Sequence, residues 1–335
     1  ALLADEQRVG KTAAAIRACD YVFARTVLVI TTASAREQWR REFQTWGWSR
    51  RIQVIHKQKD VLAPETDVAI VSWKMFRHYM PKLVARRWDV LLIDESHYAK
   101  NPGAVRTWTM YGTEPGRGGL CDAADHIWCL TGTPVPNSPA DLYPMLNRLA
   151  PERVEGLTYD DFVKRYCVVK LKRFNGVMQR VIKGGKNEDE LKERAAGFWL
   201  RRTQKDVGIR PPIFSTFPLS IDKKLPKELQ EDVDAQAVLD ALETGETKSL
   251  EMHLGPVARI TGMLKAKAVV EAVTELLEDG QLDKIVLMCW HVDVFEALWN
   301  GLMRFGVIGI AGSTPASQRD EAVRLFQRPG THVLI

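Results

Sequence analysis

Gly10, Lys11 and Thr12 stand side by side near the start of the chain, and together they have the chemistry to hold a nucleotide. Glycine lets the backbone approach a phosphate, lysine brings a positive charge to the β/γ oxygens, and a threonine hydroxyl suits Mg²⁺. A helix is expected over residues 11–23, and its N-terminal amides would complete the anion site. The leading glycine of the general phosphate-loop pattern falls at Asp5, so an ordinary helix start after a turn glycine is the alternative.

A second segment supplies the acidic groups that a phosphate loop needs. The four apolar residues 90–93 indicate a strand buried on both faces, as in a parallel sheet. Asp94 and Glu95 follow at its carboxyl end, where open α/β sheets bind ligands. Asp94 suits the Mg²⁺ shell, Glu95 can orient and deprotonate an attacking water, and His97 is expected to face the nucleotide or relay its state. A solvated strand end is the alternative for this segment alone; together with Lys11 it predicts ATP hydrolysis.

The elements that would position these residues follow an alternating pattern. Strands are expected near residues 26–31, 67–71, 90–94 and 126–131, with helices between them, which predicts a parallel α/β fold. A second α/β unit is expected from residue 265 onward. Its predicted helices are 265–277, 295–304 and 317–327, and its predicted strands are 285–289, 307–310 and 332–335. We therefore predict a first lobe at 1–150, an insertion at 151–210, a helical linker at 211–264 and a second lobe at 265–335. Within the linker, residues 222–253 are acidic and expected to be mostly helical.

The insertion contains a predicted β-hairpin. Residues 166–174 and 177–183 flank Asn175-Gly176, a strong signal for a two-residue hairpin turn. Such a hairpin would grip a DNA backbone or wedge a junction; the alternative is an edge whose lysines only discourage sheet pairing. Asn187 and Glu190 then have the spacing of a capping box at a helix start. The predicted hairpin carries five basic residues: Lys170, Lys172, Arg173, Arg180 and Lys183.

Composition and charge are those of a globular chain of 335 residues with 45% hydrophobic residues. No apolar run approaches the roughly 18 residues that span a membrane, and no signal peptide is visible, so no membrane partner is expected. Residues 1–210 carry a net charge of +11 and residues 211–335 one of −6, and a basic excess in one region suggests a phosphate-bearing partner, with ordinary solvated surface as the alternative.

Five cysteines predict reduced thiols inside a cell: Cys19, Cys121, Cys129, Cys167 and Cys289. They lack the paired short spacing of zinc ligands. A metal site of Cys121, His126 and Cys129 is conceivable, but core packing is favoured because His126 and Cys129 are expected on the strand before Thr131.

Taken together, these segments resemble the sucrose-non-fermenting-type (Swi/Snf-like) ATPases of helicase superfamily two, which are double-stranded DNA translocases. The resemblance implies two RecA-like lobes, ATP and Mg²⁺ as cofactors, and double-stranded or branched DNA as partner. It implies an ATP loop of Asp5, Glu6, Gln7, Arg8, Val9, Gly10, Lys11 and Thr12. Residues 162–167 and 312–319 are similar to the annealing-helicase, fork-remodelling branch, which links the chain to DNA repair.

Further residue roles follow from the same resemblance. Thr131, Gly132 and Thr133 match the motif that links the ATP state to DNA contact. Residues 198–203, with Asp206 and Val207, match the signature that closes the first lobe. DNA contacts are implied for Thr31, Ser72 and Trp73 in the first lobe, and for His291, Ser313, Thr314 and Arg319 in the second.

The sequence departs from the family pattern at one loop position. The usual motif reads Ala-Asp-Glu-Met-Gly-Leu-Gly-Lys-Thr, and here Gln7, Arg8 and Val9 replace Met-Gly-Leu, so Arg8 stands where a glycine is expected. The resemblance also implies an adenine-reading segment before Ala1. For the second lobe it implies two further motifs after Ile335, including arginines that reach the γ-phosphate.

Two other functions stay open at this point. They are an RNA-directed helicase or remodeller of the same superfamily, and a non-catalytic, nucleotide-gated DNA-binding module. We expect a monomer that works inside the cell: in the cytoplasm if the source is bacterial or viral, in the nucleus if it is eukaryotic.

Overall fold

The computed structural model describes residues 1–112, 118–174, 177–210, 212–220 and 254–335. It divides into two compact units, Ala1–Pro212 and Ile213–Ile335. The predicted hairpin turn at Asn175-Gly176 and the predicted acidic helical stretch 222–253 lie outside the described residues.

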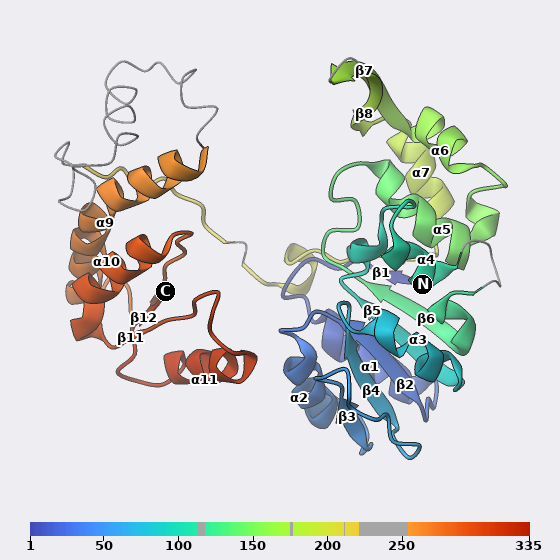
Figure 1. Ribbon diagram of the computed structural model, residues 1–335, viewed down its shortest axis with the longest axis horizontal. Coiled ribbons are helices and arrows are strands. Elements are labelled where there is room, and N and C mark those ends of the chain that lie inside the picture. The colour runs from blue at the N-terminus through green and yellow to red at the C-terminus, as the bar shows by residue number, and fades with distance from the viewer. Residues whose placement is uncertain (113–117, 175–176, 211, 221–253) are drawn as a thin grey trace. The chain divides into compact units, whose positions relative to one another are not determined.

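A seven-stranded sheet forms the centre of the first unit (Figure 1). Its strand order is β3-β4-β2-β5-β6-β1-β9, and every pairing in it is parallel, so the predicted α/β class is confirmed. The strands are β1 (Leu2–Leu3), β2 (Val27–Thr31), β3 (Ile52–Val54), β4 (Val68–Ser72), β5 (Trp88–Asp94), β6 (Ala124–Leu130) and β9 (Trp199–Leu200). The helices around the sheet are α1 (Lys11–Tyr21), α2 (Arg36–Trp46), α3 (Phe76–Val84), α4 (Val105–Tyr111) and α5 (Tyr143–Leu149).

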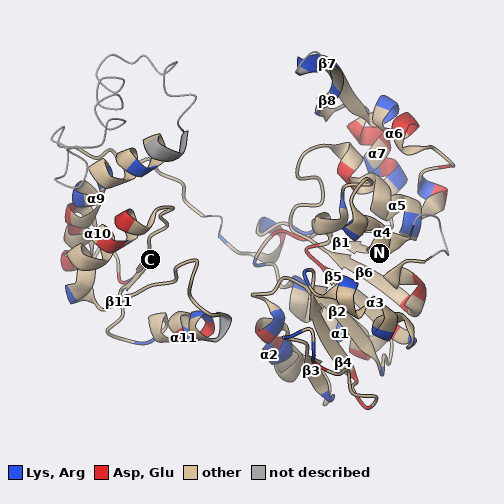
Figure 2. Cartoon of the chain, in the orientation of Figure 1, with Lys and Arg blue, Asp and Glu red and all other residues tan. Residues whose placement is uncertain are grey.

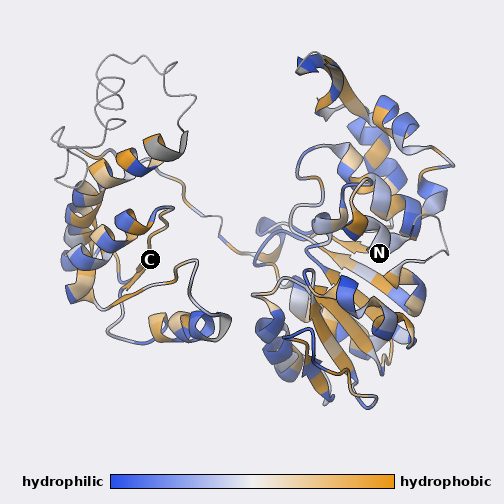
Figure 3. Cartoon of the chain, viewed as in Figure 1, coloured by the Kyte–Doolittle hydropathy of each residue, from blue (hydrophilic) through white to orange (hydrophobic). Residues whose placement is uncertain are grey.

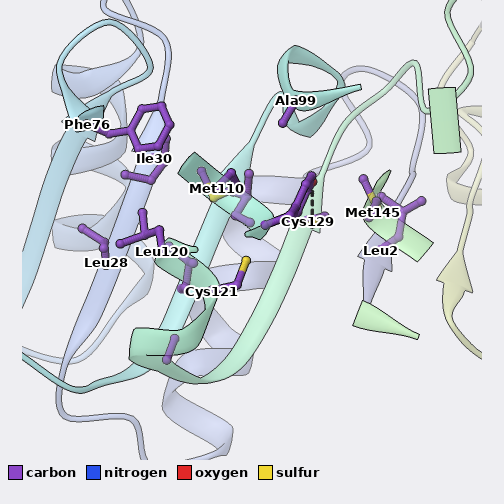
Figure 4. Packing of buried hydrophobic residues seen from close by; sticks show 14 of the residues in the cluster. Leu2, Leu28, Ile30, Phe76, Ala99, Met110, Leu120, Cys121, Cys129 and Met145 are labelled. Carbon is purple, nitrogen blue, oxygen red and sulfur yellow. Dashed lines mark hydrogen bonds between the residues drawn. The ribbon is translucent and has the colours of Figure 1, made fainter. Parts of the chain in front are cut away.

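Apolar runs in the central strands exist because helices cover both faces of the sheet. Side chains alternate between faces along a strand, so neighbours such as Leu91 and Leu92 enter different cores. One core includes Phe76 of α3 and Met145 of α5, and the other includes Ile16 of α1. Figure 3 shows these strands as strongly hydrophobic, and Figure 4 shows the first core close up.

The cysteines near the end of the sheet belong to this packing. Cys121 and Cys129 are buried in the first core, and burial raises the pKa of Cys129 to about 11. His126 is exposed rather than packed in the core, because it lies near the start of β6. No group of three metal-ligating side chains occurs within the described ranges, so the structure gives no support to the metal alternative.

The segment after α5 forms a projecting hairpin between two helices (Figure 1). Strands β7 (Cys167–Phe174) and β8 (Val177–Gly185) pair antiparallel between α6 (Tyr159–Tyr166) and α7 (Glu188–Ala195). The predicted capping box is wrong. Asn187 has a left-handed backbone with φ of 52°, and its side chain donates to the Arg165 carbonyl instead of capping α7. Glu190 accepts from the Tyr166 hydroxyl at 2.7 Å.

The second unit has its own small parallel sheet in the order β10-β12-β11. Its elements are α9 (Leu254–Glu278), β10 (Ile285–Val286), α10 (Val292–Leu302), β11 (Val307–Ile308), α11 (Ala316–Phe326) and β12 (Val333–Leu334). Helix α9 begins eleven residues before the predicted boundary at 265. Two glycines let α9 and α10 pack closely, since a Cβ at Gly301 would lie 2.6 Å from a Val270 methyl and one at Gly262 would lie 2.9 Å from a Val294 methyl.

None of the helices in the described part of the chain is both long and apolar enough to cross a membrane.

We predict that Leu92→Ala lowers the free energy of unfolding of the first unit by about 2–5 kcal/mol, because it leaves a cavity in a strand covered on both faces. Leu171→Ala is the matched control: Leu171 is 63% exposed, and its truncation is expected to change stability by no more than about 0.5 kcal/mol. Urea unfolding followed by circular dichroism measures both variants. Equal destabilisation by the two substitutions would contradict the central place of β5.

Candidate active site

The phosphate loop between β1 and α1 has the backbone of an anion cradle. Gly10 has a φ of 94°, and a Cβ built there meets no atom of the described chain within 4 Å, so the space in front of it is open. Arg8 also lies in the left-handed region with φ of 68°, a conformation that favours glycine. The loop therefore keeps its shape without the expected glycine. The Lys11 ammonium donates to the Asp5 and Glu6 carbonyls, each at 2.9 Å.

The loop is held from behind by the segment around β9. The buried Asp5 carboxylate accepts from the Arg202 backbone amide at 2.8 Å and pairs with its guanidinium at 2.5 Å. Glu6 accepts from the Gln204 amide at 2.9 Å, and the Gln204 side chain donates to the Gln7 carbonyl at 3.0 Å. Asp5 and Glu6 were predicted as ATP contacts, but in this structure their carboxylates fix the loop to residues 202–204.

The pKa of Lys11 depends on burial and on the charges of the predicted catalytic groups. Partial burial lowers the pKa of Lys11, while the negative charges of Glu95, Asp5 and Asp94 oppose that shift. Both strand-end carboxylates, Asp94 and Glu95, thus act on the charge of the lysine. Thr12, in the first turn of α1, is half-buried beside it.

Asp94, at the end of β5, is held by three residues from neighbouring segments. Its Oδ2 accepts from the Thr31 hydroxyl at 2.6 Å and from the Trp39 indole at 2.9 Å. The Trp73 indole donates to the Asp94 carbonyl at 2.8 Å. Both side-chain hydrogen bonds go to one oxygen, so Oδ1 is left to bind a metal ion or its water. Sequence reasoning missed this role of Trp39, and an indole on the helix after β2 is the signal that could have revealed it.

Glu95, His97 and Thr131 form a triangle next to the phosphate loop. His97 Nδ1 lies 3.1 Å from a Glu95 oxygen and 2.9 Å from the Thr131 hydroxyl, which itself lies 3.5 Å from that oxygen. The next residue, Gly132, lies so close that a Cβ there would sit 3.6 Å from Lys11 Nζ. The predicted catalytic and coupling residues thus meet at one edge of the sheet.

The donor set fits a magnesium ion that binds with a nucleotide. Thr12 and Asp94 offer a hydroxyl and a carboxylate, and Mg²⁺ is commonly held by one or two carboxylates, substrate phosphates and waters. The protein therefore needs to supply only some of the magnesium ligands, since phosphates and waters supply the rest.

Some of the residues predicted to contact DNA are buried and others are exposed. Thr31, Ser72 and Trp73 are buried, so this structure offers none of their side chains to DNA. Thr31 and Trp73 instead bind Asp94, as described above. The basic side chains of the hairpin are exposed. Figure 2 shows basic residues along its ribbon. These DNA contacts stay predictions.

The second unit places its predicted DNA-contact residues at the carboxyl ends of its strands. His291 and Gly312 line a cavity of about 540 Å³, and Ser313 is exposed. Arg319 donates to the Thr314 carbonyl at 2.8 Å and to the Ala311 carbonyl at 3.2 Å, so its guanidinium organises that loop.

Comparisons with known proteins give the family of the chain. Residues 1–212 match the SNF2-related domain. The chain is 26% identical over 349 residues to the "DNA annealing helicase and endonuclease ZRANB3" of Bos taurus, covering 100% of this chain and 32% of that protein. It is 26% identical over 340 residues to the "SWI/SNF-related matrix-associated actin-dependent regulator of chromatin subfamily A-like protein 1" of Drosophila melanogaster, covering 98% and 42%. The chain thus spans less than half the length of these two curated relatives.

A similar solved structure is the "Sulfolobus solfataricus SWI2/SNF2 ATPase core in complex with dsDNA". The TM-score is 0.49 and the identity 20%, over 99% of this chain and 73% of that chain.

Replacing Arg202 by Gln should loosen the phosphate loop, because the buried Asp5 carboxylate loses its charged partner. We expect destabilisation by about 2–3 kcal/mol, the scale of a hydrogen bond to a charged group, and weaker nucleotide binding. Lys205→Gln is the matched control, since Lys205 lies in the same segment and is exposed. Hydrogen exchange of residues 4–10 and nucleotide titration measure both effects. Equal protection in Arg202→Gln and the parent chain would contradict the clamp.

Proposed function

The chain belongs to the SNF2-related domain family, as its motifs predicted, and we propose that it hydrolyses ATP and couples hydrolysis to movement on double-stranded DNA. The observation that carries the proposal is the meeting of Lys11 with Glu95, His97 and Thr131 at one edge of a parallel sheet. This arrangement combines a phosphate-binding charge, a general base and a group that senses the loop beyond it.

Each residue has a defined task in this proposal. Lys11 and the amides around Gly10 bind the phosphates, and Glu95 orients the attacking water and accepts its proton. Bound Mg²⁺, held by Thr12 and Asp94, would neutralise phosphate charge. Trp39 and Thr31 fix the direction of the Asp94 carboxylate by hydrogen bonds.

Thr131 provides a route from hydrolysis to the rest of the lobe. Its hydroxyl contacts His97 and also accepts from the Thr133 amide at 3.1 Å. The loop that follows is anchored where the Asn137 amide donates to Asp141 at 2.8 Å. A change at Glu95 therefore reaches the loop through three contacts, from Glu95 to His97, from His97 to Thr131 and from Thr131 to the Thr133 amide, which supports coupling.

DNA is the partner that charge and relatives favour. Residues 1–210 carry a net charge of +11, and nucleic-acid backbones are bound mainly by such basic surface. The two relatives named above are described as an annealing helicase and a regulator of chromatin, so we extend the proposal to branched DNA such as a replication fork, in DNA repair. A protein with this substrate works inside the cell.

The test is steady-state ATP hydrolysis with no nucleic acid, with duplex DNA and with RNA. We expect duplex DNA to stimulate turnover and RNA to have little effect, with Lys11→Ala inactive but still bound to DNA. Stimulation by RNA alone would favour the RNA-directed alternative. DNA binding without turnover would leave the non-catalytic module as the function.

Glu95→Gln separates catalysis from binding, because it keeps the shape of the side chain but removes the base. ATP binding should persist while turnover falls about 10²–10⁴-fold, the usual contribution of a general base. Glu42→Gln is the control, since this carboxylate binds the Trp46 indole, away from the loop. Unchanged turnover in Glu95→Gln would assign the base elsewhere.

A further inference from the structure

The hairpin β7–β8 lies in the most one-sided stretch of charge in the first unit. Between Asp161 and Glu188 the sequence contains eight Lys and Arg residues and no Asp or Glu. Figure 2 shows basic residues on the hairpin, which projects beyond α6. A ribbon of this charge is complementary to a phosphate backbone.

Strand register divides the hairpin into two different faces. Residues directly opposite in an antiparallel pair share a face, and faces alternate along each strand. Leu171 is opposite Arg180 and Arg173 is opposite Met178, so these four share one face. Lys170 and Lys172 lie on the other face. Lys183 falls at the register shift beside Val168/Val169 and belongs to neither set.

The face with Leu171 is covered at its base and open further out. Val169 and Ile182, an opposite pair on that face, pack against Val163 and Cys167. Leu171 and Met178 continue the same face but are 63% and 57% exposed. An apolar strip therefore begins in a core and ends in solvent.

Arginines flank the exposed part of the strip. Arg180 pairs with Asp160 at 3.5 Å, but both side chains are largely exposed, and such pairs contribute little. The guanidinium of Arg180 can therefore exchange this partner for a phosphate at small cost.

These features match one ligand chemistry. Leucine and methionine are among the side chains that proteins press against or between base steps, and unstacked bases bind apolar and arginine surfaces. Continuous duplex offers phosphates but no open base face. A junction offers both, because the last base pair of each arm has one uncovered face.

We propose that the Leu171–Met178 face of the hairpin binds the terminal base pair of a DNA junction, while Lys170 and Lys172 contact the phosphates of an adjoining arm. This inference rests on the proposed function for DNA as the partner. It adds a structural reason for the chain to prefer branched over continuous DNA.

The experiment compares binding of the full chain to a fork and to a duplex of the same sequence by fluorescence anisotropy across a salt series. The outer ends of both DNAs are closed by hairpin loops, so uncovered base pairs occur at the junction of the fork and nowhere in the duplex. The fork carries 2-aminopurine in its terminal base pair, which reports unstacking. The parent chain should prefer the fork roughly tenfold, the scale of one stacking contact, and raise the 2-aminopurine signal. The paired variant Leu171→Ser with Met178→Ser should lose both effects and keep its duplex affinity.

Two further variants make the result specific. Leu171→Phe with Met178→Phe should retain the fork preference, because the face stays apolar. Lys170→Ser with Lys172→Ser should weaken binding to the fork more than binding to the duplex, because only the fork has an adjoining arm. For the fork, the slope of log K against log salt should fall by roughly 0.9 for each phosphate that the variant no longer binds. Circular dichroism confirms that each variant is folded.

The outcomes separate this inference from the proposed function. A parent chain that binds duplex and fork equally, or a Ser pair that keeps the fork preference, overturns the inference and leaves DNA-stimulated hydrolysis untouched. A parent chain that binds neither DNA overturns the proposed function itself. A dimer that the Ser pair abolishes in sedimentation would instead assign the apolar face to a second copy of the chain.

Discussion

The ion pair between Asp5 and Arg202 is the contact on which the nucleotide site depends. Asp5 is fully buried, and an unpaired carboxylate in that position would be strongly unfavourable. Arg202 donates its backbone amide to this carboxylate and pairs with it through the guanidinium. Gln204 donates to the Glu6 carboxylate and to the Gln7 carbonyl. The loop that presents Lys11 is therefore held by a segment at the far end of the first unit, and the position of the lysine depends on it.

Two non-glycine residues at the same edge of the sheet have strained backbones. Arg8 and Glu95 both have left-handed backbones, which cost non-glycine residues about 1–2 kcal/mol. Such conformations persist where surrounding contacts determine them, and here Gln204 binds the carbonyl of Gln7 beside Arg8, while His97 lies within hydrogen-bond distance of the Glu95 side chain. The strain places a loop amide and the Glu95 carboxylate, our proposed base, where an ordinary helix or strand would not.

Local chemistry explains what the sequence predicted well. Runs of apolar residues predict β2, β4 and β5, because both faces of these strands are covered by helices. Asp94 and Glu95 follow such a run directly, which made them easy to find. Non-local contacts explain the failures: nothing near Asp5 reveals that its partner lies 197 residues away. The contact of Asp94 with Trp39 crosses 55 residues, and its one signal in the sequence is the indole on the helix after β2. Asn187 is a residue type that commonly caps a helix N-terminus, but its backbone is left-handed and its side chain donates to the Arg165 carbonyl.

The position of β1 has a consequence for how the first unit folds. This two-residue strand lies between β6 and β9, so one of its neighbours is synthesised about two hundred residues after it. Contacts across such separations form slowly, since the loop must close before the contact stabilises it. During synthesis β2, β4 and β5 can pair while β1 still lacks β9. The phosphate loop therefore reaches its final structure only after β9 has been synthesised. Nucleotide binding by a chain still on the ribosome would report that the first unit is complete.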